Sequence, residues 1–225
     1  MISPHLQGII TDTKPIFCCI IAYLLGSIPT GYLMGRFFYH KDIRLSGSGN
    51  IGATNAQRTF GTGAGVLVLA IDILKAVAAI VITRQVLKTV PGAIDTNMFI
   101  ALAGILVILG HIFPVWLRFK GGKGVGVAAG VFVALSPGQL FIALILFVFL
   151  VSITKYISLS SLLAAIGYLL MEVFSQYIMG FPDRWRLLLV FLVVALIIYR
   201  HMDNIRRLTQ GTEPKFSFGK KPQAE

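Results

Sequence analysis

Two glycine-rich segments bring small, polar and basic residues together in patterns that could hold a phosphate group. The first reads Ser46-Gly-Ser-Gly-Asn-Ile-Gly-Ala-Thr-Asn-Ala-Gln-Arg58, and the second reads Gly110-His-Ile-Phe-Pro-Val-Trp-Leu-Arg-Phe-Lys-Gly-Gly-Lys-Gly124. Glycine allows the backbone to approach a ligand closely, and clustered N–H groups beside Arg and Lys attract phosphate. Both segments therefore predict binding of phosphorylated ligands.

The first segment is expected to hold a phosphate together with the reacting centre. Its Gly47-Ser-Gly-Asn-Ile-Gly52 stretch matches G-x-G-x-x-G, but the dinucleotide-binding form of that pattern needs a preceding strand and a βαβ unit, so we reject it. What remains is a cluster of short hydrogen-bonding residues followed by the forked guanidinium of Arg58, which can present two parallel donors. The candidate residues are Ser48, Gly49, Asn50, Gly52, Thr54, Asn55 and Arg58.

The second segment is expected to bind a second phosphate. It is not a Walker A loop, because Lys123 is followed by Gly where that motif requires Ser or Thr. It opens an apolar span, where free N–H groups and the helix dipole favour an anion. Positive charge flanking a span would explain Lys120 but not the glycines. The candidate residues are Lys120, Gly121, Gly122, Lys123 and Gly124.

A third polar segment, residues 200–213, follows the last apolar run. Within it His201 and Asn204 are spaced i and i+3, so they share a face if the segment is helical. A basic helix that binds lipid headgroups at the membrane surface is the competing interpretation. His111 and His201 are the candidate general bases beside the motifs. A phosphate oxygen of a substrate is the alternative, which we favour, with the histidines orienting the hydroxyl. The spacing of metal ligands is absent, and we expect no cofactor.

The composition indicates an integral membrane protein. Of 225 residues, 56% are hydrophobic and 13% are charged, whereas soluble domains average about 25% charged residues. We expect residues 1–225 to form one all-α membrane domain, because lipid-facing strand edges would leave backbone groups unpaired. The net charge of +11 suits anionic lipid or an anionic substrate. Nucleic acid is not expected as a partner, since the cations lie in short loops between apolar runs.

Seven apolar runs predict about seven membrane-spanning helices, and five or six remain possible if residues 125–154 form a re-entrant or bent unit. The runs are residues 16–38, 62–82, 97–117, 125–136, 138–154, 158–180 and 185–200. If the chain crosses the membrane seven times, fourteen of its 20 Lys and Arg residues lie on one side and five lie on the other. The remaining one, Lys75, lies within a span. The positive side should be cytoplasmic, which places the N-terminus outside and the C-terminus and all three motifs inside.

Three ionisable residues lie within the apolar runs. Asp72 and Lys75 are i and i+3 in the second run, and each would cost about 3 kcal/mol if unpaired at the bilayer centre. We therefore expect them to pair with each other or with another span, in a structural role. Glu172, alone in the sixth run, gives no prediction.

The three motifs together resemble the signatures of the bacterial acyl-phosphate:glycerol-3-phosphate acyltransferases of the PlsY type. They read S-G-S-G-N-I-G-A-T-N-x-x-R, G-H-I-F-P-V-W-x-x-F-K-G-G-K-G-V and R-H-x-x-N-I-x-R-L-x-x-G-x-E, and the likeness extends to segments 26–31, 72–75 and 156–161. One departure is Gly126-Val127, where the family usually has Ala-Thr.

The resemblance implies transfer of an acyl chain from acyl phosphate to glycerol 3-phosphate, giving lysophosphatidic acid and phosphate, at the cytoplasmic face of the bacterial inner membrane. It adds Ser158, Asn204 and Glu213 to the substrate-binding candidates and Ser48, Arg58, His111 and His201 to the catalytic ones. The expected partners are the two substrates and membrane lipid, with no obligate protein partner. A small anion transporter or flippase is the alternative of a different class, but it would favour polar residues near the midplane and an inverted repeat. A non-catalytic scaffold that binds headgroups does not explain three motifs converging on one face.

Overall fold

The computed structural model describes residues 13–90, 95–180 and 182–216, and within these ranges the regular elements are all helical. Each apolar run forms a helix, because in a bilayer only intrachain hydrogen bonds can satisfy the backbone. The elements are α2 Lys14–Ser27, α3 Thr30–Phe38, η1 Ile43–Leu45, α4 Ala53–Phe60, α5 Thr62–Leu87, α6 Thr96–Ile112, η2 Val115–Leu117, α7 Val125–Leu135, α8 Pro137–Thr154, α9 Ile157–Met179, α10 Arg184–Arg200 and α11 Met202–Thr209.

The first apolar run is not one straight helix. α2 and α3 meet at 44°, and the break falls at Ile28 and Pro29. Pro29 has no N–H to donate, and its ring disfavours the helical conformation of the preceding residue. Ile28 accordingly has a ψ of 113°. The carbonyl of Ile28 is thereby freed for contacts outside its own helix.

By length and hydropathy, fewer helices qualify as membrane spans than the seven expected. In the described ranges four helices can cross a membrane, Thr62–Leu87, Thr96–Leu117, Pro137–Thr154 and Ile157–Ile178, and the bent pairs α2–α3 and α10–α11 raise the number to six. The remaining apolar helix, α7, has 11 residues, about 16 Å at 1.5 Å per residue. It is too short to cross alone, and the count of seven stays a prediction.

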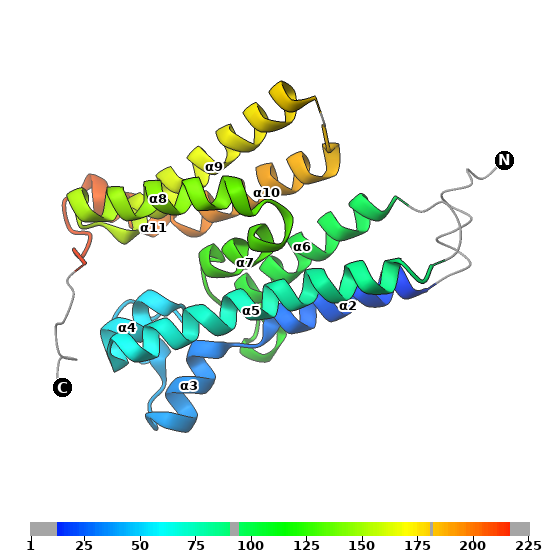
Figure 1. Cartoon of the computed structure of the whole chain (residues 1–225). Coiled ribbons are helices and arrows are strands. Elements are labelled where there is room, and N and C mark those ends of the chain that lie inside the picture. Colours follow the sequence, from blue (N-terminus) through cyan, green and yellow to red (C-terminus); the bar gives the residue numbers. More distant parts are fainter. Residues whose placement is uncertain (1–12, 91–94, 181, 217–225) are drawn as a thin grey trace.

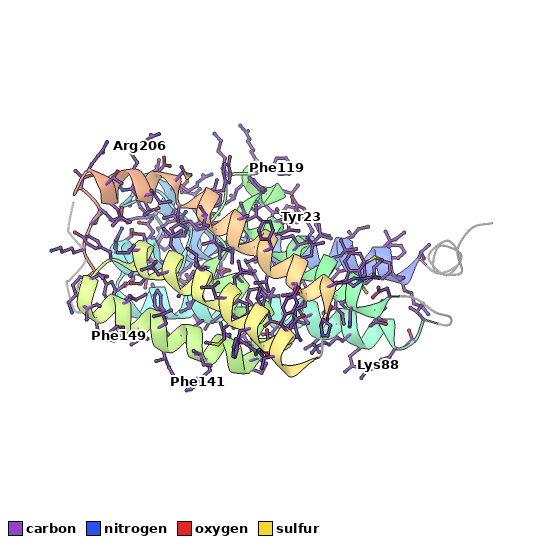
Figure 2. The ribbon with its side chains drawn as sticks, turned by 90° about the horizontal axis from the view of Figure 1, so that it is seen from above. Tyr23, Lys88, Phe119, Phe141, Phe149 and Arg206 are labelled. Atoms are coloured by element: carbon purple, nitrogen blue, oxygen red, sulfur yellow. The ribbon has the colours of Figure 1, made fainter. Side chains whose placement is uncertain are left out.

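Close backbone contacts hold the central helices together. A Cβ at Gly26 of α2 would overlap the Val107 carbonyl of α6, and one at Gly110 of α6 would overlap the Tyr23 carbonyl of α2. Small residues of this kind allow membrane helices to approach closely. On the outside of the bundle, Phe141 and Phe149 of α8 are 64% and 58% exposed and extend outward in Figure 2, as lipid-facing side chains do.

The elements that carry the first and third motifs lie at one end of the bundle. Figure 1 shows α3, α4 and α11 at that end, whereas α2 begins and α5 ends at the opposite end. We call the first the motif end. Lys220 and Lys221, two of the fourteen cations assigned to the cytoplasmic side, lie outside the described residues, and the orientation in the membrane remains a prediction.

The charged residues inside the bundle are paired. Lys75 Nζ lies 2.8 Å from Asp72 Oδ1, which confirms the expected pair. Glu172 is fully buried, and its Oε1 lies 2.6 Å from Nε of Arg186 on the next helix. No prediction could be made for Glu172, because its partner lies across the α9–α10 turn rather than one helical turn away.

Candidate active site

Glu213 is the buried acceptor around which the motif end is organised. Its Oε1 accepts hydrogen bonds from Ser158 Oγ at 2.6 Å and Asn204 Nδ2 at 2.7 Å, and its Oε2 accepts from Arg207 Nε at 2.8 Å. Burial alone would raise the pKa of Glu213, but the three donors outweigh it and hold the pKa below its usual range. The carboxylate is thus ionised, and both oxygens are occupied by protein donors. Ser158 and Glu213, which the family resemblance assigns to substrate binding, bind each other in this structure, and their contact with substrate stays a prediction.

Lys123 lies at the centre of the same cluster. Its Nζ donates to Oδ1 of Asn204, so one amide bridges the ammonium and the carboxylate of Glu213. Burial, opposed by the attraction of Glu213, lowers the pKa of Lys123 to about 8, and Arg207, Arg58 and Arg200 contribute in the same direction as burial. Lys123, Arg58 and Arg207, one cation from each motif, therefore interact with one carboxylate, and Arg200 lies near Lys123. Such an excess of positive charge suits a phosphate dianion.

Arg58 connects the first motif to the third. It is the sixth residue of α4, and its Nη2 donates to the Pro214 carbonyl at 3.4 Å. Burial lowers the pKa of Arg58, partly offset by Glu213, yet a guanidinium stays charged at any physiological pH. The expected convergence of the first and third motifs on one site is confirmed at this contact.

The glycines of the second motif use their N–H groups within the protein. Gly121 N donates to the Ile112 carbonyl and Gly122 N donates to the His111 carbonyl, both at 3.0 Å. The carbonyls of the two glycines accept from Arg200 at 3.2 Å each. The amides of Gly121 and Gly122 are therefore occupied within the protein, and phosphate binding at these glycines stays a prediction. They form a hairpin, held by Arg200, that delivers Lys123 to the cluster.

The two residues that flank this hairpin, Lys120 and Gly124, lie in different surroundings. Gly124, at a φ of 85°, reverses the chain immediately before α7 begins at Val125, so the expected helix N-terminus does follow the motif. Lys120 is exposed, and the neighbouring Phe119 extends from the surface in Figure 2. A phosphate-binding role for Lys120 gains no support from this placement.

The two histidines present opposite hydrogen-bonding patterns. His111 is 5% exposed, and its Nδ1 lies 3.3 Å from Lys75 Nζ. His201 is 3% exposed, and its Nδ1 lies 2.8 Å from the Ile197 carbonyl. Because a carbonyl only accepts, His201 carries its proton on Nδ1, and its Nε2 can accept another. The charged neighbours of His201 are Lys123, Glu213 and Arg200, so it faces the cluster.

The loop of the first motif is held from inside by Asn55. This side chain is 2% exposed. Its Nδ2 lies within 3.2 Å of the carbonyls of Ile43, Ser46 and Asn50, and its Oδ1 accepts from Ser48 N at 2.8 Å. The prediction that Asn55 donates to a phosphate is wrong, because its amide is used up in shaping the loop.

The rest of the loop remains accessible. Ser48 and Gly49 are exposed, and Gly49 turns the chain at a φ of 68°. Asn50 Oδ1 accepts a hydrogen bond from Gly52 N at 2.9 Å. This bond does not use the N–H groups of the Asn50 side chain. Thr54 lies half-buried in the first turn of α4. These residues keep their candidacy as ligands, next to the helix that carries Arg58.

The sequence missed Arg200 and Arg207 as members of the site. Both are fixed positions of the third motif but were not named as site candidates, yet Arg200 holds the glycine hairpin and Arg207 pairs with Glu213. A signal was present for Arg207, because it follows Asn204 by three residues on the same helix and so shares its face.

Comparison with known proteins agrees with the family resemblance of the three motifs. The family model described as glycerol-3-phosphate acyltransferase matches residues 16–211. A glycerol-3-phosphate acyltransferase of Macrococcus caseolyticus is 40% identical over 89% of this chain and 96% of the relative, and glycerol-3-phosphate acyltransferase 2 of Bacillus anthracis is 42% identical over 89% and 98%.

Two crystal structures of PlsY, an integral membrane glycerol 3-phosphate acyltransferase, are similar across nearly the whole chain. The glycerol 3-phosphate form is 36% identical with a TM-score of 0.80, covering 90% of this chain and 96% of that one. The lysophosphatidic acid form is 35% identical with a TM-score of 0.77, covering 90% and 95%. With the motifs converging as described and this similarity extending over the membrane helices, the chain belongs to the glycerol-3-phosphate acyltransferase family.

Proposed function

We propose that this protein transfers an acyl chain from acyl phosphate to glycerol 3-phosphate, forming 1-acyl-glycerol 3-phosphate (lysophosphatidic acid) and phosphate. The observation that carries the proposal is the cluster of Arg58, Lys123 and Arg207 around Glu213, with Arg200 beside Lys123, at one end of an apolar bundle. Both substrates are anionic, the donor carries an acyl tail, and the product is a lipid. The cations match the phosphates, and the exposed apolar helices match the tail.

The reaction needs little covalent help from the protein. A hydroxyl oxygen of glycerol 3-phosphate attacks the acyl carbonyl carbon, a new ester bond forms, and the bond to the phosphate oxygen breaks with its electron pair leaving on phosphate. Phosphate is already a good leaving group. Aligning the hydroxyl with the carbonyl accounts for several kcal/mol of the barrier reduction, about 7 or more in well-oriented systems. Cations beside the developing oxyanion supply further stabilisation.

The three motifs take separate roles in this proposal. Ser48, Asn50 and Thr54 contact the acyl phosphate, and Lys123 with Asn204 binds the phosphate of glycerol 3-phosphate, with Arg58 between them. The hydroxyl proton passes to a phosphate oxygen of a substrate. His201, whose Nε2 is open to accept a hydrogen bond, orients that hydroxyl. His111 does not fit the role of base, because its contact with Lys75 occupies Nδ1.

We further propose that the whole chain is one inner-membrane domain whose motif end faces the cytoplasm. The excess of Lys and Arg in the loops of that end supports this orientation. Glycerol 3-phosphate would enter from the cytoplasm, and the acyl chain would lie among the apolar helices.

The test is to supply purified protein in lipid with glycerol 3-phosphate and either acyl phosphate or an acyl carrier protein thioester. We expect lysophosphatidic acid with acyl phosphate only; equal rates with the thioester would refute the donor assignment. Lys123→Met should abolish most activity. Lys120→Met, in an exposed residue of the same loop, is the matched control and should retain it.

A further inference from the structure

The buried pair of Asp72 and Lys75 reaches beyond its own helix. Asp72 Oδ1 accepts from Lys75 Nζ at 2.8 Å and from Thr30 Oγ1 at 2.9 Å. Lys75 Nζ also donates to the Ile28 carbonyl at 2.9 Å, the group freed at the α2–α3 break. The pair therefore fixes the position of that break against α5.

The third contact of Lys75 decides the protonation pattern of His111. Lys75 Nζ lies 3.3 Å from His111 Nδ1, and Asp72 Oδ1 lies 3.7 Å from the same nitrogen. An ammonium has three donors and no acceptor, so Nδ1 must be the acceptor. The proton of the neutral imidazole is then on Nε2.

The Nε2 edge of His111 lies against the glycine hairpin. A Cβ built on Gly122 would overlap Nε2 of His111, and Gly122 N donates to the His111 carbonyl at 3.0 Å. The hairpin is thus held on one side by His111 and on the other by Arg200. The next residue along the chain is Lys123, so a shift of the imidazole would disturb the backbone that carries Lys123.

We propose that Asp72 and Lys75 are positioning residues for acyl transfer. Through Nδ1 they hold His111 in one tautomer and one orientation against Gly122, and His111 in turn sets where Lys123 meets the phosphate of glycerol 3-phosphate. This inference rests on the proposed role of Lys123. A pair that only held helices together would require neither the contact with His111 nor a glycine at position 122.

The variant D72N/K75M tests the proposal without leaving an unpaired charge inside the bundle, which is the usual reason such single variants fail to fold. The introduced amide can still accept from Thr30, but the introduced thioether cannot donate to His111. We expect a KM for glycerol 3-phosphate raised at least about tenfold with a much smaller change in kcat, because ground-state and transition-state binding weaken together.

The matched control is E172Q/R186M. It removes another ion pair inside the bundle, which joins α9 and α10 at 2.6 Å. That ion pair does not contact the glycine hairpin. The KM of this control should stay within about twofold of wild type. An unchanged KM in folded D72N/K75M, or an equal rise in both double variants, would overturn the proposal.

A second measurement does not depend on activity or on the folding of D72N/K75M. In protein carrying 15N-labelled histidine, imidazole shifts assigned by comparison with His111→Gln should report a proton on Nε2 and none on Nδ1 of His111. A proton on Nδ1 would refute the positioning role even if the enzyme is fully active. Conversely, wild-type protein inactive with glycerol 3-phosphate but showing the Nε2 tautomer would refute the proposed function and leave the contact standing.

Discussion

At the residue scale, Lys123 combines a strong electrostatic role with an unusual sensitivity to pH. Burial lowers its pKa to about 8, so at neutral pH the ammonium predominates, but it begins to lose its proton within the range in which enzymes are commonly assayed. A bound phosphate would restore the stabilisation that burial removed. Proton binding and phosphate binding should therefore favour each other at this side chain.

We predict an alkaline limb in the pH dependence of KM for glycerol 3-phosphate. The pKa of Lys123 is lowered, so the charged form is complete well below pH 8 and disappears as the pH rises through about 8. KM should be constant near pH 6.5 to 7 and should rise roughly tenfold per pH unit well above 8, since binding needs the protonated form. Steady-state kinetics across this range measure it.

The variant Lys123→Arg tests whether Lys123 is the group whose titration changes the KM. A guanidinium stays charged through the whole range, so the variant should lose the limb, whatever its absolute KM. The same limb in Lys123→Arg would mean that another group titrates.

At the element scale, the loop before α4 depends on one amide. The two N–H groups of Asn55 serve the carbonyls of Ile43, Ser46 and Asn50, whereas Asn50 only accepts, from Gly52 N. Asn55→Asp replaces a donor with a carboxylate facing carbonyl oxygens. At about 1 kcal/mol for each lost hydrogen bond, it should cost at least about 3 kcal/mol of folding free energy.

The control is Asn50→Asp, which keeps the accepting oxygen. Thermal unfolding in detergent should show a fall of about 5 °C or more for Asn55→Asp and a much smaller fall for Asn50→Asp. Equal falls would show that Asn55 does not organise the loop.

The glycine hairpin gives a steric prediction at the same scale. Gly122→Ala should disable the enzyme because its Cβ overlaps the imidazole of His111, and not because it displaces a ligand directly. Removing the imidazole makes room for that Cβ. The double variant H111A/G122A should therefore be no less active than H111A alone, a non-additivity that kcat/KM measurements detect.

Gly121 supplies the comparison. A Cβ there would overlap the backbone carbonyl of His111 and the Pro114 ring, which His111→Ala leaves in place. H111A/G121A should thus be less active than H111A. Additive losses in both double variants would exclude the steric explanation for Gly122.

These elements also show what the sequence could predict. The i, i+3 spacing of Asp72 and Lys75 predicted their pairing, since helix geometry alone places them together. The buried role of Asn55 was not predictable, because its partners Ile43 and Ser46 are brought near by a turn whose shape the residue itself creates. The internal hydrogen bonds of the Gly121 and Gly122 amides were not predictable for the same reason, because their acceptors lie on α6, before an intervening turn.

At the scale of the whole molecule, composition and apolar runs predicted an all-helical membrane protein, and the described residues agree. The fourth run, residues 125–136, indicated a short helix, and α7 has 11 residues, whereas the 44° angle between α2 and α3 within the first run does not follow from hydropathy. Hydropathy averages over a window and is blind to a local break, although Pro29 marked one.

The last prediction concerns the orientation of the whole bundle. Figure 2 shows Arg206 and Phe149 at one end of the molecule and Lys88 at the other. The cation distribution predicts that the end bearing Arg206 is cytoplasmic. Single cysteines at Gln57, Thr209 and Lys88, in a background with Cys18 and Cys19 replaced, test it with a membrane-impermeant thiol reagent added to intact cells. Only the Lys88→Cys protein should be labelled before lysis, and all three afterwards. Labelling of Gln57→Cys and Thr209→Cys from outside, with Lys88→Cys protected, would show the opposite orientation, and glycerol 3-phosphate would then have no route to the site from the cytoplasm.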